Sequence, residues 1–227
     1  AWDHINVFPT FEDSVDQFRL YLDTIEPGGA IIYNERDEVL KKLVEESDAP
    51  VKRFPYSLPN FTIEDGTTYI ETAEGMMPLQ IFGEHNLSNL EAARWICLEM
   101  GLQEDDFHDA IMSFSGAQNR MELFHQGNIK VFRDFAHAPS KVSASVKALK
   151  EQFGKVRTVL ELHTFSSLNK SFLKEYHGTM NDADIAIVFF SKEAIRHKKL
   201  EDISAEEIYQ SFGKKEKNQL YQVVDAY

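Results

Sequence analysis

The spacing of hydrophobic residues predicts a chain of alternating short helices and strands. After Thr10, apolar residues recur at helical spacing, and Pro27-Gly28-Gly29 ends this predicted helix. Short apolar runs farther along predict strands, and turns at Asp65-Gly66 and Glu74-Gly75 predict a β-ribbon. We expect strands at 30–34 and 51–54, helices at 37–47, 90–100 and 104–113, and the ribbon at 61–82.

A strand pair lies at the centre of the sequence. Glu122–Gln126 and Lys130–Phe135 have strand-like composition, and Gly127-Asn128 supplies a tight turn between them. Pro139 marks the start of a following helix, because proline is favoured in the first helical turn. This hairpin separates one α/β region before it from another after it.

Three polar residues around the hairpin are candidate ligand contacts. Asp134 and His137 follow the second strand, at the end where open α/β sheets place ligands. Arg120 precedes the first strand, and its guanidinium can reach a phosphate. A salt bridge between Arg120 and Glu122, with His137 as a helix cap, explains the same residues equally well, because loose groups of this kind are common.

The rest of the sequence predicts a parallel sheet. An amphipathic helix runs from Val142 to Phe153, and buried-type strands follow at 156–162, 183–191 and 220–224. Strands that alternate with helices are typical of a doubly wound parallel sheet, so we expect an α/β fold. Further helices are expected at 172–180 and 204–212.

Composition and charge narrow the class of protein. Of the 227 residues, 43% are hydrophobic and 17 are Phe, which indicates a packed globular protein. The formal net charge of −13 argues against nucleic-acid binding, because phosphate contacts need a basic face. No apolar run approaches the ~18 residues of a membrane span, and the one cysteine, Cys97, is typical of a reducing compartment. We therefore expect a cytoplasmic protein without a membrane partner.

Four motifs resemble those of one enzyme family. Arg120-Met121-Glu122 and the later Asp-Phe-Ala-His-Ala-Pro at 134–139 are similar to the Arg-x-Glu and Asp-Tyr-Ala-His-x-Pro signature of the Mur ligases. These ATP-dependent enzymes build the peptide stem of the bacterial cell wall. The other motifs follow the family's order: Asp3-His4, Gly83–Asn89 and His163–Ser166.

The resemblance implies a domain organisation. Residues 1–115 correspond to the second part of the family's central ATP-binding domain. Residues 116–227 correspond to its Rossmann-like carboxyl-terminal domain, which we expect to stop short of the family's last strands. The sequence contains no Gly-Lys-Ser or Gly-Lys-Thr of a P-loop, which cradles ATP phosphates. We therefore expect an internal part of a longer ligase, inactive by itself.

Residues that bind ATP and Mg²⁺ follow from the resemblance. In the family, the Asp-His pair supplies a magnesium ligand, which assigns that role to His4. The motif Gly-x-His-Asn-x-x-Asn surrounds adenine, and an amide suits adenine because it both donates and accepts hydrogen bonds. The motif assigns this role to His85, Asn86 and Asn89, and Asn89 is the first candidate among the three. From chemistry alone, a solvated His4 and helix capping by Asn86 or Ser88 are the alternatives.

The resemblance also implies catalytic and acceptor-binding residues. Arg120 would balance the phosphate charge, and His137 would lie near the nucleotide or the incoming nucleophile. Asp134 would hold the ribose hydroxyls. For the acceptor pocket we expect polar residues after the next strand, which ordinary strand-end polarity explains equally well: His163, Ser166 and Asn169.

The implied reaction joins an amine to UDP-N-acetylmuramate through an acyl phosphate made from ATP. Within the family, the motifs are most similar to murein peptide ligases, which add L-alanyl-γ-D-glutamyl-meso-diaminopimelate. UDP-N-acetylmuramate–L-alanine ligase is the alternative, and a noncatalytic nucleotide-binding or scaffolding module is an alternative of another class. Ala138 stands where many members have a second His. Ser167 stands where many have Arg, and this second departure weakens any inference about how the acceptor is held.

Overall fold

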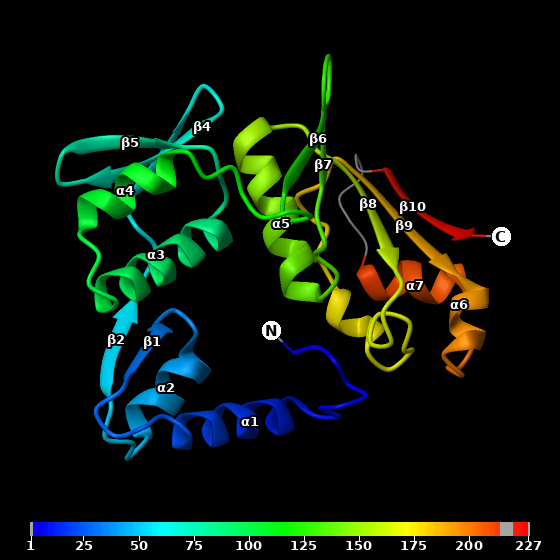
Figure 1. Ribbon diagram of the computed structural model, residues 1–227. Helices are drawn as coiled ribbons and strands as arrows, with labels where there is room; N and C mark the ends of the chain where they lie inside the picture. Colours follow the sequence, from blue (N-terminus) through cyan, green and yellow to red (C-terminus); the bar gives the residue numbers. More distant parts are fainter. Residues whose placement is uncertain (1, 214–219, 227) are drawn as a thin grey trace. The chain divides into compact units, whose positions relative to one another are not determined.

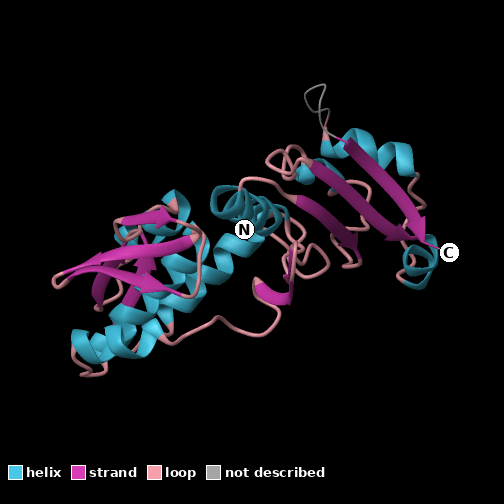
Figure 2. Ribbon diagram, turned by 90° about the horizontal axis from the view of Figure 1, so that it is seen from above, coloured by secondary structure: helices cyan, strands magenta, loops and turns pink. Residues whose placement is uncertain are grey.

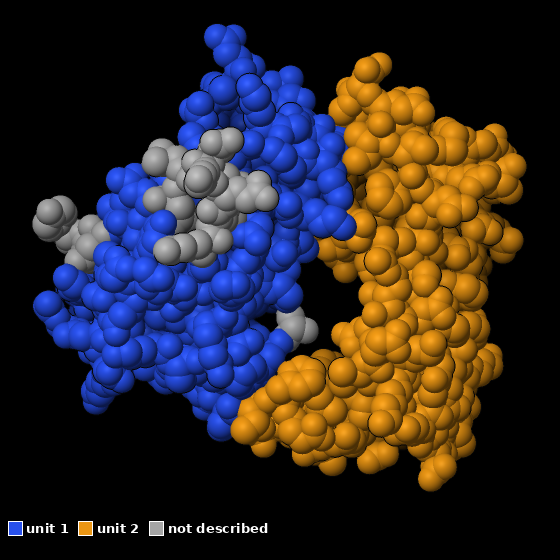
Figure 3. All heavy atoms as spheres, turned by 180° about the vertical axis from the view of Figure 1, so that it is seen from behind, with its two compact units in different colours: residues 1–9, 117–227 blue, residues 10–116 orange. Residues whose placement is uncertain are grey.

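The computed structural model describes residues 2–213 and 220–226, and it divides the chain into two compact units. Unit 1 combines Ala1–Pro9 with Ala117–Tyr227, and unit 2 is Thr10–Gly116 (Figure 3). The chain therefore passes between the units twice. The sequence prediction placed residues 1–9 with the first domain, whereas their contacts are with the carboxyl-terminal unit. The functional assignment of the two parts stays a prediction.

Unit 2 begins with a β-α-β arrangement preceded by a helix (Figure 1). Thr10 caps α1 through a reciprocal pair of hydrogen bonds with Asp13, which satisfies amide groups at the helix start. Strands β1 and β2 are parallel, and Val44 of α2 packs with Leu22 of α1 and Ile31 of β1 in a small core. The elements are α1 (Phe11–Asp23), β1 (Ala30–Asn34), α2 (Glu38–Glu46) and β2 (Lys52–Tyr56).

The second half of unit 2 is an antiparallel ribbon packed with two helices. Its turns lie at the predicted Asp-Gly and Glu-Gly positions, and Ile70, Leu79, Leu87 and Phe107 form the core between ribbon and helices. The prediction of a ribbon is thus confirmed. The elements are β3 (Phe61–Glu64), β4 (Thr67–Thr72), β5 (Gly75–Leu79), α3 (Glu84–Glu99) and α4 (Glu104–Met112).

Helix α3 begins six residues before the predicted start at Leu90, because Gly83 serves as its N-cap. Gly83 has φ 86° and ψ 140°, a conformation that side chains disfavour. No side chain caps this helix, so the predicted capping by Asn86 or Ser88 is wrong. Both residues lie inside the helix, where Asn86 Nδ2 donates to the Phe82 carbonyl at 2.9 Å.

Unit 1 contains a hairpin and a three-stranded parallel sheet. The predicted hairpin forms, with a bulge between Leu123 and His125, and it extends away from the rest of the unit (Figure 1). The sheet has the order β10-β9-β8, with its arrows pointing the same way (Figure 2). Its core includes Val146, Val188 and Ile208. The α/β fold class is confirmed. The elements are β6 (Glu122–Gln126), β7 (Lys130–Arg133), α5 (Pro139–Phe153), β8 (Arg157–Leu162), the 3₁₀ helix η1 (Leu173–Tyr176), β9 (Ile185–Ser191), α6 (Lys192–His197), α7 (Ala205–Phe212) and β10 (Leu220–Ala226).

Two helices of unit 1 differ from their predictions. The expected helix 172–180 is only the short η1, and Gly178 with φ 73° follows it in a left-handed conformation. The short helix α6 was not predicted, because it has one fully buried apolar residue, Ile195, among basic residues and so shows no apolar periodicity.

Within 2–213 and 220–226, no helix is both long enough and apolar enough to cross a bilayer.

The start of α7 gives a testable electrostatic prediction. Lys170 Nζ lies 2.8 Å from the Glu207 carboxylate, and this hydrogen bond, with those from the Ser204 backbone and hydroxyl, lowers the pKa of Glu207 to about 2. Such a carboxyl stabilises the fold above its unfolded pKa of about 4.3, and the contribution is lost as pH falls through about 2. We expect Lys170→Met to raise the pKa of Glu207 in a carboxyl ¹³C NMR titration. Lys155→Met is the control, and an unchanged pKa in Lys170→Met would contradict the assignment.

Candidate functional site

The loop between β7 and α5 holds Asp134 in a fixed orientation. One carboxylate oxygen accepts a hydrogen bond from Ser145 Oγ at 2.7 Å, and the other accepts from the Ala136 backbone N–H at 3.0 Å. Ser145 is buried on α5, so this bond ties the loop to the helix that follows it. A carboxylate held in this way can still accept hydrogen bonds from a ligand, because each oxygen has two lone pairs.

His137 has partners on both ring nitrogens. Nδ1 lies 2.8 Å from the Phe135 carbonyl oxygen, and Nε2 lies 3.0 Å from Asp3 Oδ2. The His137 and Asp3 side chains are only 10% and 9% exposed. Both facing oxygens are acceptors, so the doubly protonated imidazolium satisfies this geometry in full. His137 does not cap α5, whose N-cap is Ala138 without a side-chain bond, and that alternative is wrong.

The Asp3 carboxylate is the centre of a small buried network. Burial acts to raise the pKa of Asp3, but the His4 backbone N–H, the Ser166 hydroxyl and the charge of His137 outweigh it, so the pKa lies below its usual value. The His4 N–H donates to Asp3 Oδ1 at 2.7 Å. Asp3 therefore favours its charged form beside His137.

The amino-terminal segment, residues 2–9, packs on unit 1 through further contacts. The Ile5 N–H donates to Ser166 Oγ at 3.3 Å, and the Trp2 ring meets Phe172 edge-on with centroids 5.4 Å apart. The Tyr176 hydroxyl donates to the His137 carbonyl oxygen. Burial and the Asp3 charge raise the pKa of this phenol, so it stays a donor. The segment, the loop after β7 and η1 are thus joined around His137.

The three predicted acceptor residues have different surroundings. The His163 ring is partly exposed and lies 6.0 Å from the His137 ring, measured between centroids. Ser166 is 2% exposed and accepts the Ile5 N–H, while Asn169 Oδ1 accepts the backbone N–H and hydroxyl of Ser171. Ser166 and Asn169 therefore have structural partners within the unit.

Arg120 lies in a loop with an unusual backbone. Its neighbours Asn119 and Met121 have φ 57° and 50°, which is costly for residues other than glycine. The predicted salt bridge with Glu122 is wrong, because the Glu122 carboxylate binds Arg133 at 3.1 Å and the Asn119 N–H at 2.9 Å. Arg120 itself is exposed, with no ion pair to any residue that the structure describes. Its guanidinium is available to a phosphate.

The predicted adenine-binding residues lie on the first turns of α3, in unit 2. His85 and Asn86 precede Asn89 by four and three positions, which places them beside it on the helix surface. Asn89 is exposed, whereas Asn86 is half-buried and bonded to Phe82. Ser88 Oγ accepts from Asn34 Nδ2 at 3.2 Å, which fixes the start of α3 beside the end of β1.

His4 is the predicted magnesium ligand. Its side chain is 71% exposed and its backbone is left-handed, with φ 57°. No three His, Cys, Asp or Glu side chains of the described chain form a group that could hold a metal ion. His4 by itself therefore offers a single donor to a cation, and its role as a magnesium ligand stays a prediction.

Within unit 1, the structure brings His137 and His163 close together, with Ser166 joined to the same network through Asp3 and Ile5. Sequence reasoning missed Asp3 and Tyr176 as partners of His137. The Asp-His motif also pointed to Asp3 as a functional residue, although a role was assigned from the sequence to His4 only. Tyr176 gave no such signal, because one buried aromatic residue looks like any other. The parallel sheet with helices beside it defines an α/β protein, and polar residues lie at the carboxyl ends of its strands, where open sheets of this kind place ligands.

Known proteins agree with this architecture. No protein-family model matches the sequence. A UDP-N-acetylmuramate–L-alanine ligase from Caldicellulosiruptor bescii is 26% identical over 221 residues, which cover 91% of this chain and 48% of that ligase. A murein peptide ligase from Psychrobacter arcticus has a TM-score of 0.58 at 18% identity, over 93% of this chain and 51% of its own. A MurF ligase from Thermotoga maritima in complex with ADP has a TM-score of 0.67 at 18% identity, over 98% and 56%.

The sequence relatives are ligases that act on UDP-N-acetylmuramate, and the solved structures of Mur ligases share the fold of this chain. The chain spans about half the length of the curated relatives that it matches.

Proposed function

We propose that this chain carries part of the active site of an ATP-dependent amide ligase acting on UDP-N-acetylmuramate. The similarity to an L-alanine ligase over 91% of the chain, with four motifs in the family's order, carries the proposal. ATP would phosphorylate the muramoyl carboxylate and leave as ADP. The acceptor amine would then attack the acyl phosphate, and the tetrahedral intermediate would release phosphate.

Three groups of residues would bind the adenine, the ribose and the phosphates of ATP. On α3, His85, Asn86 and the exposed Asn89 would surround adenine, with Asn89 pairing with its polar edge. The Asp134 carboxylate, already oriented by Ser145, would accept the ribose hydroxyls. The exposed Arg120 would neutralise charge that develops on the phosphates.

The remaining roles concern the metal and the acceptor. His4 would give one ligand to the magnesium that enters with ATP, and the metal would neutralise phosphate charge. His137, held between Phe135 and Asp3, would lie at the incoming nucleophile, with His163 beside it. Asn169 would shape the acceptor pocket through the turn that it stabilises with Ser171, and Ser166 through its bond to the Ile5 N–H.

The identity of the acceptor is a separate question. The names of the curated relatives favour L-alanine, while the Asp-His and Asp-Phe-Ala-His motifs favour the tripeptide L-alanyl-γ-D-glutamyl-meso-diaminopimelate. Phosphate release by the complete ligase, with UDP-N-acetylmuramate and either acceptor, distinguishes the two. A noncatalytic nucleotide-binding module would bind ATP but would release no phosphate with either acceptor.

Replacement of Asn89 by alanine tests the adenine site on the chain itself. We expect calorimetry with MgATP to give weak binding by the wild type and about tenfold weaker binding by Asn89→Ala, because a missing hydrogen-bond partner for adenine costs about 1–1.5 kcal/mol. Gln17→Ala removes an exposed amide from α1 of the same unit and should leave the affinity unchanged. Equal ATP affinity of Asn89→Ala and wild type would reject the role of α3.

A further inference from the structure

A cavity in unit 1 lies apart from the residues assigned above. It has a volume of about 310 Å³ and is lined by residues of three segments: the amino-terminal segment, the first turn of α5, and η1 with its flanks. A water molecule occupies about 30 Å³ in the liquid, so this space admits a small organic molecule. The lining residues are Trp2, Pro139, Ser140, Ser143, Phe172, Glu175 and Thr179.

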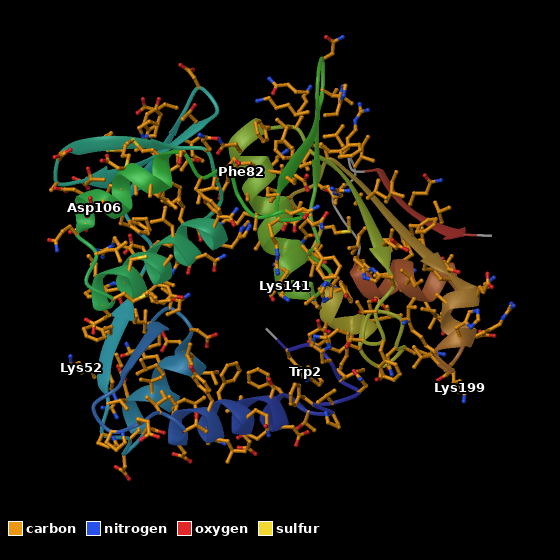
Figure 4. All side chains as sticks on the ribbon, in the orientation of Figure 1. Trp2, Lys52, Phe82, Asp106, Lys141 and Lys199 are labelled. Atoms are coloured by element: carbon orange, nitrogen blue, oxygen red, sulfur yellow. The ribbon has the colours of Figure 1, made fainter. Side chains whose placement is uncertain are left out.

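The aromatic part of the lining is held rigidly. Trp2 Nε1 donates to the Phe8 carbonyl at 3.0 Å, and the indole meets the buried Phe172 ring edge-on. Figure 4 labels Trp2 on the amino-terminal segment. Because the indole is fixed on two sides, its position does not depend on a ligand. Indole and phenyl rings present negative electrostatic faces, and Trp attracts cations best.

The charge of the lining residues also favours a cationic ligand. Glu175 is exposed on η1 and has no ion pair with any residue in the described ranges. None of the seven lining residues is cationic. The Thr179 hydroxyl already donates to the Tyr176 carbonyl, so the remaining hydroxyls in the lining are those of Ser140 and Ser143. One carboxylate beside an indole, with hydroxyl groups that can accept N–H donors, suits a ligand with a positive charge.

We propose that this cavity binds the ammonium group of a small organic amine, with Glu175 as its counter-ion and Trp2 as its aromatic contact. This site does not depend on the proposed ligase reaction. Its residues are not among those assigned to the nucleotide, the metal or the acceptor.

The chain offers a direct reporter of this site. It contains two tryptophans, so Trp95→Phe leaves Trp2 as the only one. In that background, n-propylammonium chloride should change Trp2 emission saturably at millimolar concentration, at constant ionic strength. The uncharged n-propanol and the anion propionate, which are similar in size, should give no saturable change below tenfold higher concentration.

Two variants separate charge recognition from a nonspecific effect. Glu175→Gln keeps the size of the side chain and should weaken propylammonium binding about three- to fivefold, the upper part of the range of an exposed ion pair. Glu161→Gln removes an exposed carboxylate from β8 in the same unit and should bind as before. Equal affinity of Glu175→Gln and its parent, equal binding of n-propanol, or no saturable change with the amine would each overturn the proposal.

Discussion

Replacement of Tyr176 by alanine is expected to lower the free energy of unfolding of unit 1 by about 3–5 kcal/mol, the usual cost of removing a large buried aromatic side chain. Tyr176 is 1% exposed, and its ring stacks on Phe212 with centroids 5.1 Å apart. It also contacts Phe172 edge-on at 6.2 Å. The substitution therefore leaves a cavity between η1 and α7, in the middle of the largest core.

The hydroxyl of Tyr176 contributes separately. It donates to the carbonyl of His137, so Tyr176→Phe should cost only about 1–2 kcal/mol, the penalty for one unpaired buried acceptor. Urea denaturation, monitored through the amide exchange of residues in unit 1, measures the free energy of unfolding of both variants. Phe124→Ala is the matched control, since that ring is 67% exposed on the hairpin, and it should stay within ~0.5 kcal/mol of wild type. A loss below 1 kcal/mol in Tyr176→Ala would contradict the packing described above.

Much of the secondary structure follows from local sequence. The strand at Ala30–Asn34 and the hairpin closed by Gly127-Asn128 form as predicted, because alternation and turn residues act over a few positions. Pro139 begins α5 for the same kind of reason. The helix expected at 204–212 also forms, as α7, and Ser204 caps it in a capping box with Glu207.

Features that depend on distant residues could not be predicted. The partner of His137 is Asp3, which is 134 positions away, and no local rule selects it. Glu122 binds Arg133 across the hairpin rather than the nearby Arg120, because paired strands bring those residues opposite each other. The early start of α3 depends on Gly83 adopting a positive φ, which the apolar periodicity does not reveal.

The contact between Asp3 and His137 leads to the second large expected effect. Asp3→Asn keeps the shape of the side chain but removes its charge, and a hydrogen bond to a charged group contributes about 1.5–3 kcal/mol. Because a few contacts, those of Asp3, Trp2 and Ile5 among them, join residues 2–9 to the rest of unit 1, we expect the loss to open these residues locally rather than to unfold unit 1. Each 1.4 kcal/mol is a factor of ten, so exchange of the Ile5 amide, which donates to Ser166, should become about 10–100-fold faster.

Two further measurements decide whether the charge of Asp3 holds this segment. Asp109→Asn removes an exposed carboxylate from α4, and Ile5 should exchange at the wild-type rate in that variant. In the Trp95→Phe background, Asp3→Asn should shift Trp2 emission to longer wavelength, because the indole loses its contact with Phe172 and meets water. The pKa of Asp3 lies below its unfolded value of about 3.9, so the wild-type segment should stay docked above that pH and open as the pH falls through the folded pKa. Unchanged exchange of Ile5 in Asp3→Asn would show instead that Trp2 and Phe172 hold the segment without the ion pair.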